Sequence, residues 1–124
     1  MSGRKNNLLQ FHTIIDGDMS LSSLTSSVTN IQFLDNLAIQ LNFSGSPVGT
    51  FEVQVSIDYA QDNNGNVTNS GNWVPVTLNP SPDTSQGSPI FINMQQLAAP
   101  WIRVVYTKTS GSGTLNAYIS GKMI

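Results

Sequence analysis

The sequence predicts an all-β protein: a single antiparallel β-sandwich, jelly-roll-like, with about eight short strands. The dominant hydrophobic period is two, which is the period of a strand with one buried face. Clusters of Gly, Pro, Asn and Ser separate the alternating segments, as turns do in sandwiches and jelly rolls. The chain shows no heptad and no alternation of strand-like with helix-like segments, so nothing favours a coiled coil or a parallel α/β fold.

The clearest predicted strand is 50–59, TFEVQVSIDY, in which apolar and polar residues alternate strictly. The segment 36–44, NLAIQLNFS, has the same pattern, and the turn-forming sequence SGSPVG links the two. We therefore expect these two strands to pair as an antiparallel hairpin. The residues of 50–59 expected to face the core are Phe51, Val53, Val55 and Ile57.

Seven further segments show weaker or shorter alternation of the same kind. Pro75 removes a backbone donor, so the strand that contains it is expected at a sheet edge or a bulge. The segment 94–100 is the one expected helical turn, ended by Pro100, and 79–89 is expected to be a long loop. The remaining predicted strands are 8–15, 19–24, 28–35, 73–78, 89–94, 101–108 and 114–124.

The length of 124 residues fits one domain, predicted here as 8–124, preceded by a polar, flexible arm over 1–7. Only 10% of the residues are charged, against roughly 25% in typical domains, and the net charge is −2. This balance argues against nucleic-acid binding, which needs clustered Lys and Arg. No apolar run approaches the length of a membrane span, and with 0 Cys there is no thiol chemistry.

The polar stretch 61–73, QDNNGNVTNSGNW, is the most site-like segment of the chain. Asp62, Asn64 and Asn66 have the 1-3-5 spacing of a calcium-binding EF-hand loop. The sixth and twelfth positions of that loop hold Val67 and Trp73, where a glycine and a glutamate are required. We therefore expect tight turns at Asn64-Gly65 and Asn69-Ser70-Gly71 that join two strands, and no metal site.

Neither the histidine nor the carboxylates form a catalytic pattern. His12 is the only histidine, and no second histidine, cysteine or nucleophile motif accompanies it. Glu52 and Asp58 lie on the polar face of one predicted strand, where charges are normally solvated. The sequence predicts no enzyme, with no catalytic residue, no cofactor and no metal.

Three aromatic residues lie outside the main apolar faces or near the end of the chain. Trp73 and Trp101 each open a predicted strand, displaced from its apolar side, and Tyr118 lies in the last strand. Such residues cap the end of a core, line a subunit contact or stack on a sugar, and the sequence leaves these three roles open.

Two stretches carry a family resemblance. The segment 33–78 and the C-terminal run APWIRVVYTKTSGSGTLNAYISGKMI (99–124) resemble small all-β virion structural proteins of tailed bacteriophages, of the capsid decoration or cement type. The shared pattern is one of strands and turns without catalytic residues. The resemblance implies a non-enzymatic decoration protein that binds the major capsid protein lattice or other virion proteins, located on the virion and made in the host bacterial cytoplasm.

The resemblance also implies a homo-oligomer, and with the N-terminal segment and the polar loops as contacts we expect a trimer or a dimer. The low charge and the lack of a long apolar run predict no nucleic-acid and no membrane partner. A tail-associated carbohydrate- or receptor-binding β-sandwich module is the alternative function, and head and tail placement are not distinguished by the sequence. A strand such as 8–15 would add to the edge of a neighbour's sheet. The residues predicted to bind partners are Arg4, Lys5, Leu8, Leu9, Trp73 and Trp101.

Overall fold

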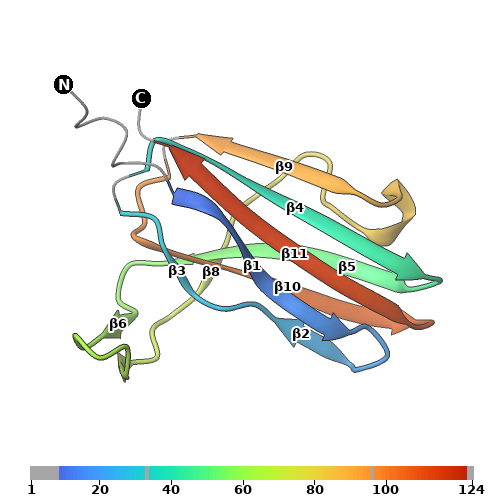
Figure 1. Cartoon of the computed structure of the whole chain (residues 1–124), viewed down its shortest axis with the longest axis horizontal. Coiled ribbons are helices and arrows are strands. Elements are labelled where there is room, and N and C mark those ends of the chain that lie inside the picture. The colour runs from blue at the N-terminus through green and yellow to red at the C-terminus, as the bar shows by residue number, and fades with distance from the viewer. Residues whose placement is uncertain (1–8, 33, 96, 123–124) are drawn as a thin grey trace.

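In the computed structural model, residues 9–32, 34–95 and 97–122 are described, with side chains from Thr13 onward, and they form an antiparallel β-sandwich (Figure 1). One sheet has the order β1-β11-β4-β9 and the other the order β2-β10-β5-β8, with β3 also pairing with β10. The predicted sandwich is confirmed, and its jelly-roll connectivity stays a prediction.

The strands of the four-stranded sheet are β1 (Leu9–Asp18), β11 (Gly113–Lys122), β4 (Asn36–Gly45) and β9 (Ile90–Gln95). Those of the five-stranded sheet are β2 (Ser23–Thr25), β3 (Thr29–Asn30), β10 (Trp101–Ser110), β5 (Val48–Ser56) and β8 (Val74–Pro75). A separate small pair consists of β6 (Ala60–Gln61) and β7 (Val67–Asn69), and η2 (Thr84–Gln86) is a 3-10 turn.

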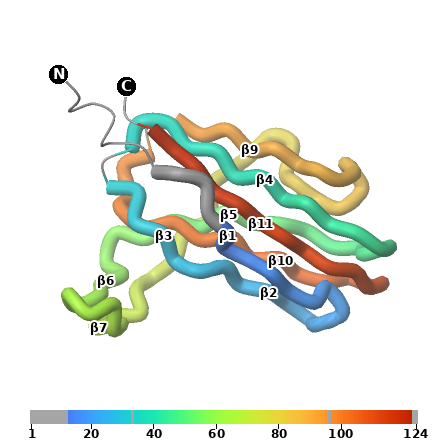
Figure 2. The backbone as a smooth tube through the Cα atoms, viewed as in Figure 1, coloured from blue at the N-terminus to red at the C-terminus, as the bar shows by residue number. Residues whose placement is uncertain are grey.

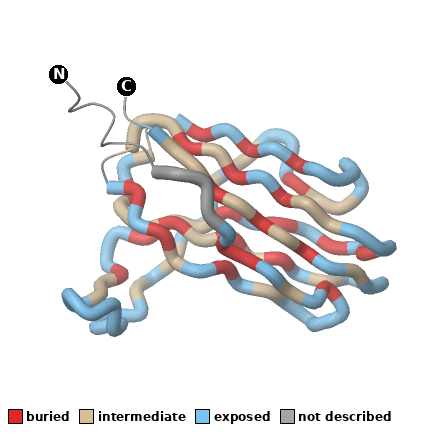
Figure 3. The backbone as a smooth tube through the Cα atoms, viewed as in Figure 1, coloured by how far each residue is buried: buried red, intermediate tan, exposed pale blue. Residues whose placement is uncertain are grey.

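The core lies between the two sheets and follows from the period-two pattern. Figure 3 shows buried and exposed positions alternating along the long strands. Each fully buried aliphatic side chain stabilises the fold by about 1.5–3 kcal/mol relative to its exposed state. The core residues without measurable exposure include Ile39, Leu41, Val53, Val104 and Leu115.

The predicted core face of 50–59 is confirmed at Phe51 and Val53 but is wrong at Ile57, whose side chain is 79% exposed. Strand β5 ends at Ser56, and the Ser56 hydroxyl accepts a hydrogen bond from the Tyr59 backbone N–H at 3.1 Å. This turn breaks the alternation, so Tyr59 is buried and Ile57 faces outward.

The predicted hairpin of 36–44 with 50–59 is wrong. Strand β4 pairs with β11 and β9, whereas β5 pairs with β10 and β8 in the other sheet. The turn-forming residues between them make an arch that crosses from one layer to the other instead of a hairpin loop.

A second arch, between β10 and β11, lies beside the first at the same end of the sandwich (Figure 1). Gly45 is the pairing partner of Gly113. A Cβ atom on Gly113 would lie 2.0 Å from the Ser44 carbonyl oxygen, so only glycine allows this close approach. Gly113 therefore permits β4 and β11 to pair closely at the end of the sheet where both arches begin.

Shorter elements also differ from expectation. The predicted strand 73–78 reduces to Val74–Pro75, which lies at a sheet edge as Pro75 required. Val74 is 59% exposed, while Val76 and Leu78 pack against the core. The helical turn expected over 94–100 is wrong for the described residues, because β9 continues to Gln95 and 97–100 contain no helix. Among the described residues, no helix has the length and apolar character needed to cross a membrane.

Candidate functional site

Residues 57–72 leave the five-stranded sheet after β5 and return before β8, and we call this segment the projection. Figure 2 shows β6 and β7 lying away from the two main layers, at one end of the molecule. Ala60 pairs with Asn69 and Gln61 with Val67, so the projection is a small two-stranded element and not an open loop. Positions 62–70 are all exposed.

The tip of the projection is closed by its own hydrogen bonds. The Asp62 carboxylate accepts the backbone N–H groups of Asn64 and Asn66, both at 2.9 Å. The Asp62 backbone N–H donates to the Asn66 carbonyl at 2.9 Å, and Gly65 has φ +84°. The predicted turn at Asn64-Gly65 is confirmed. The hydrogen bonds that the Asp62 carboxylate accepts lower its pKa, and the backbone N–H of Asn66 has the largest effect. The charged carboxylate of Asp62 holds the turn together.

The base of the projection is held by Asp58. Its carboxylate accepts the Asn72 backbone N–H at 2.8 Å, the Asn72 side-chain amide at 2.7 Å and the Ser56 hydroxyl at 2.9 Å. These hydrogen bonds lower the pKa of Asp58, and the one from the backbone N–H of Asn72 has the largest effect. Because Asp58 and Asn72 lie near opposite ends of the segment, the bonds tie its two stems together.

Three rings, which we call the aromatic anchor, connect the projection to the sandwich: Tyr59, Trp73 and Trp101. The Tyr59 ring is buried and lies 5.6 Å from Trp73 and 4.9 Å from Trp101 between centroids. Ring pairs at such distances add about 0.5–1.5 kcal/mol each beyond their burial. The Trp73 indole N–H donates to the Ser70 carbonyl at 3.1 Å, which links the anchor directly to the projection.

Arg103 completes this arrangement on the outer face of β10. Its guanidinium carbon lies 4.3 Å from the Trp73 ring centroid, a cation–π contact. Its Nε donates to the Gln54 side-chain oxygen at 2.7 Å across the β10–β5 pair. Arg103 and Trp73 therefore fix each other where β8 meets the sheet.

The structure separates the three aromatic residues that the sequence singles out, Trp73, Trp101 and Tyr118, into two places. Trp73 and Trp101 come together through Tyr59 at one end of the sandwich. Tyr118 lies on β11, in the other sheet, so the three rings do not form one platform for a sugar. The half-buried indoles anchor the projection, and the exposed residues of the projection form the outer surface.

The N-terminal predictions are only partly within the described residues. Arg4, Lys5 and Leu8 lie outside them, and for Leu9 and His12 only the backbone is described. From Leu9 onward the chain forms β1 and pairs with β11 of its own sheet. Of the segment 8–15, expected to extend a neighbour's sheet, residues 9–15 are thus part of a strand of this molecule, with an edge position in its sheet.

Sequence reasoning missed the roles of Tyr59, Arg103 and Ile57. Tyr59 continues the alternation of the predicted strand 50–59, so the sequence pattern gives it no role of its own. The turn after Ser56 has no periodic pattern that would reveal it. Arg103 carried one usable signal: it is the only charged side chain among the three outward positions 101, 103 and 105 of a strand that opens with Trp101. Its stacking partner, Trp73, is 30 positions away in the chain, so their contact could not be read from sequence.

In the described part of the chain, no group of three or more His, Cys, Asp or Glu side chains is placed to hold a metal ion. Comparison with models of known protein families and with curated proteins gives no match for this chain.

Proposed function

We propose that this chain is a non-enzymatic structural protein of a bacteriophage virion, a capsid decoration protein that binds the lattice of the major capsid protein. The resemblance of 33–78 and 99–124 supports the virion role. The observation that carries the mode of binding is the projection, a hydrogen-bonded element. It presents apolar and uncharged polar groups to solvent beside two carboxylates, those of Asp58 and Asp62, which its own hydrogen bonds engage.

The surface of the projection has the composition of a protein contact. Ile57 is 79% exposed and Val67 is 55% exposed, and they stand among asparagine, serine and threonine side chains. The centres of protein interfaces are depleted in charged residues and contain apolar groups surrounded by hydrogen-bonding ones. Burial of these two side chains against a partner supplies a hydrophobic contribution that they lack in the isolated chain.

The hydrogen bonds within the projection favour binding because they order the segment before it meets a partner. The carboxylates of Asp58 and Asp62 close its base and its tip before any partner is present. Preorganised loops lose less conformational entropy on association than mobile ones. On a shell, repeated copies of a modest contact, or an oligomer such as the proposed trimer or dimer, give strong attachment in total.

The start of β1 lies at the same end of the sandwich as the projection (Figure 1). Arg4, Lys5 and Leu8 precede β1 in the chain and lie outside the described residues, so their part in the contact stays a prediction. The opposite end carries the two arches between sheets and the turn between β1 and β2. Attachment through one end leaves the other end, and both sheet faces, available.

The attachment is tested with empty shells assembled from the major capsid protein of the same phage. Ile57→Asp and Val67→Asp each place a charge at an exposed position, so the melting temperature should change little while co-sedimentation with shells falls at least tenfold. Leu21→Asp is the matched control, because Leu21 is 53% exposed at the opposite end and its substitution should leave co-sedimentation unchanged.

Two results would count against the proposal. Wild-type chain that does not sediment with shells would remove the decoration role. The second result is that Ile57→Asp and Val67→Asp bind shells as the wild type does, while Leu21→Asp does not bind. The contact would then lie at the arch end, and the projection would have no role in it.

A further inference from the structure

The outer face of the four-stranded sheet carries a second organised surface, on β11, β4 and β9. Cross-strand pairing places Ala38 between Ser120 and Asn93 on one rung of the sheet. The next rung has Gln40 between Tyr118 and Phe91. Small residues on one rung beside large ones on the next produce a depression in the face, which we call the amide trough.

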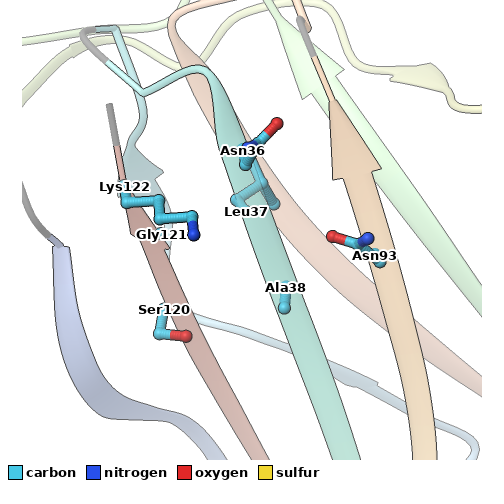
Figure 4. A pocket seen from close by; sticks show the side chains of 7 residues that line it. All are labelled: Asn36, Leu37, Ala38, Asn93, Ser120, Gly121 and Lys122. Atoms are coloured by element: carbon cyan, nitrogen blue, oxygen red, sulfur yellow. The ribbon is translucent and has the colours of Figure 1, made fainter. Parts of the chain in front are cut away.

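Two adjoining hollows make up the amide trough. One has a volume of about 210 Å³ and the other about 320 Å³, and both are lined by Ala38 and Ser120. In Figure 4, Ser120 and Lys122 on β11 and Asn93 on β9 point toward β4 from either side, over Ala38. The methyl group of Ala38 forms the floor, and longer side chains form the walls.

The side chains around the trough are mainly neutral hydrogen-bonding groups. The Gln40 amide nitrogen donates to the Asn42 side-chain oxygen at 3.0 Å, which orients both amides. This leaves the Gln40 oxygen as an acceptor and the Asn42 nitrogen as a donor. Asn36 and Asn93 add two more amides, and among the residues lining the hollows only Lys122, at one end, is charged.

Aromatic surface borders the same hollow as the amide pair. Phe91 is 65% exposed, although it lies within a strand, as the second residue of β9, and not in a loop. Tyr118 borders the hollow from the other side of Gln40. An exposed ring beside fixed amides offers an apolar face and directional hydrogen bonds to one ligand, which is the usual make-up of a small-molecule site.

We propose that the amide trough binds a neutral oligosaccharide. A sugar ring has C–H groups on its face and hydroxyl groups on its edge, so it packs on Phe91 and Tyr118 while the amides of Gln40 and Asn42 bond to its hydroxyls. Amides both donate and accept, as hydroxyls do, and neutral walls favour a ligand without charge. The two hollows adjoin along the strands, so the ligand is a chain of sugars.

A protein partner fits this face less well. The centre of a protein interface usually contains several clustered aromatic or aliphatic anchors, and Phe91 is the one large apolar side chain of the trough that is mostly exposed. The proposal does not depend on the decoration role, because the trough lies on a sheet face and the projection lies at one end of the molecule.

The test uses the full chain on an array of immobilised neutral oligosaccharides, built from hexoses and N-acetylhexosamines, with sialylated oligosaccharides as acidic counterparts. The wild type should bind at least one neutral member. Ala38→Leu fills the floor of the trough and should weaken that binding at least tenfold, and Tyr118→Ala should do the same. Ala38→Ser, which keeps the floor small, should bind within about threefold of wild type. Trp73→Ala, next to β8 of the other sheet, should also retain binding.

The melting temperature of Ala38→Leu and Tyr118→Ala is measured alongside, and amide chemical shifts of the wild type are followed during titration with the bound oligosaccharide. Shifts confined to β4, β9 and β11 support the proposal even if one variant is unstable. Absence of binding to every neutral oligosaccharide, binding to sialylated ones alone, or shifts on the projection would overturn it. So would shifts of β4, β9 and β11 caused by shells of capsid protein, because the occupant would then be a protein.

Discussion

At the scale of single residues, Tyr106 places a polar hydroxyl group inside the apolar core. Its side chain has no measurable exposure, and its ring packs 5.0 Å from that of Phe51 between centroids. The Tyr106 hydroxyl has no hydrogen-bond partner among the described residues. Burial also raises its pKa, because the charged phenolate is poorly solvated there.

Removal of this hydroxyl should not destabilise the protein. An unpaired buried hydroxyl costs free energy, so Tyr106→Phe is expected to leave the free energy of unfolding unchanged or to raise it by up to about 1 kcal/mol. Urea denaturation of the two proteins measures the difference. Ile119→Ala sets the scale, since it creates a cavity and should cost about 2–5 kcal/mol. A loss of more than about 1 kcal/mol in Tyr106→Phe would show that the hydroxyl has a bonding partner.

At the scale of elements, the projection depends on Asp58, and this gives it a pH dependence. The pKa of Asp58 is lower in the folded chain than its ordinary value of 3.8, mainly because Asn72 donates to it. The charged carboxylate therefore stabilises the folded state above that value, and the stabilisation is lost as the pH falls through the lower folded pKa.

Asp58→Asn should consequently be less stable than wild type at pH 7, and the difference should shrink as the pH falls below 3.8. Asp18 and Asp62 also have lowered pKa values and are retained in both proteins, so their contribution cancels in the comparison. Urea midpoints between pH 2 and pH 7 measure the effect. A difference between the two proteins that stays constant over this range would mean that ionised Asp58 does not hold the projection.

Strands were easier to predict than their partners. Period-two alternation located β4 and β10 to within a few residues, because each has one buried face. The sequence between β4 and β5 has the residues of a hairpin turn, yet the same residues permit an arch. In the arch, β4 pairs with β11, where Gly113 closely approaches Ser44, and these two segments are far apart in the chain. The amide trough likewise needs the register of three strands, which no single strand encodes.

At the scale of the whole molecule, two different surfaces occupy different parts of one sandwich. The projection and the start of β1 lie at one end, and the amide trough lies on the face of the four-stranded sheet. A chain attached to a shell by its end would keep this face open to solvent. The proposed attachment and the proposed sugar binding are therefore compatible on one particle.

The orientation of the chain on a shell tests the central claim most directly. Shells of the major capsid protein, decorated with the full chain, are imaged by electron cryomicroscopy, and the sandwich is fitted into the added density. We expect the projection and the start of β1 to contact the shell, with the arches between β4 and β5 and between β10 and β11 pointing outward. Added density with the arches against the shell, or shells without added density, would contradict the account.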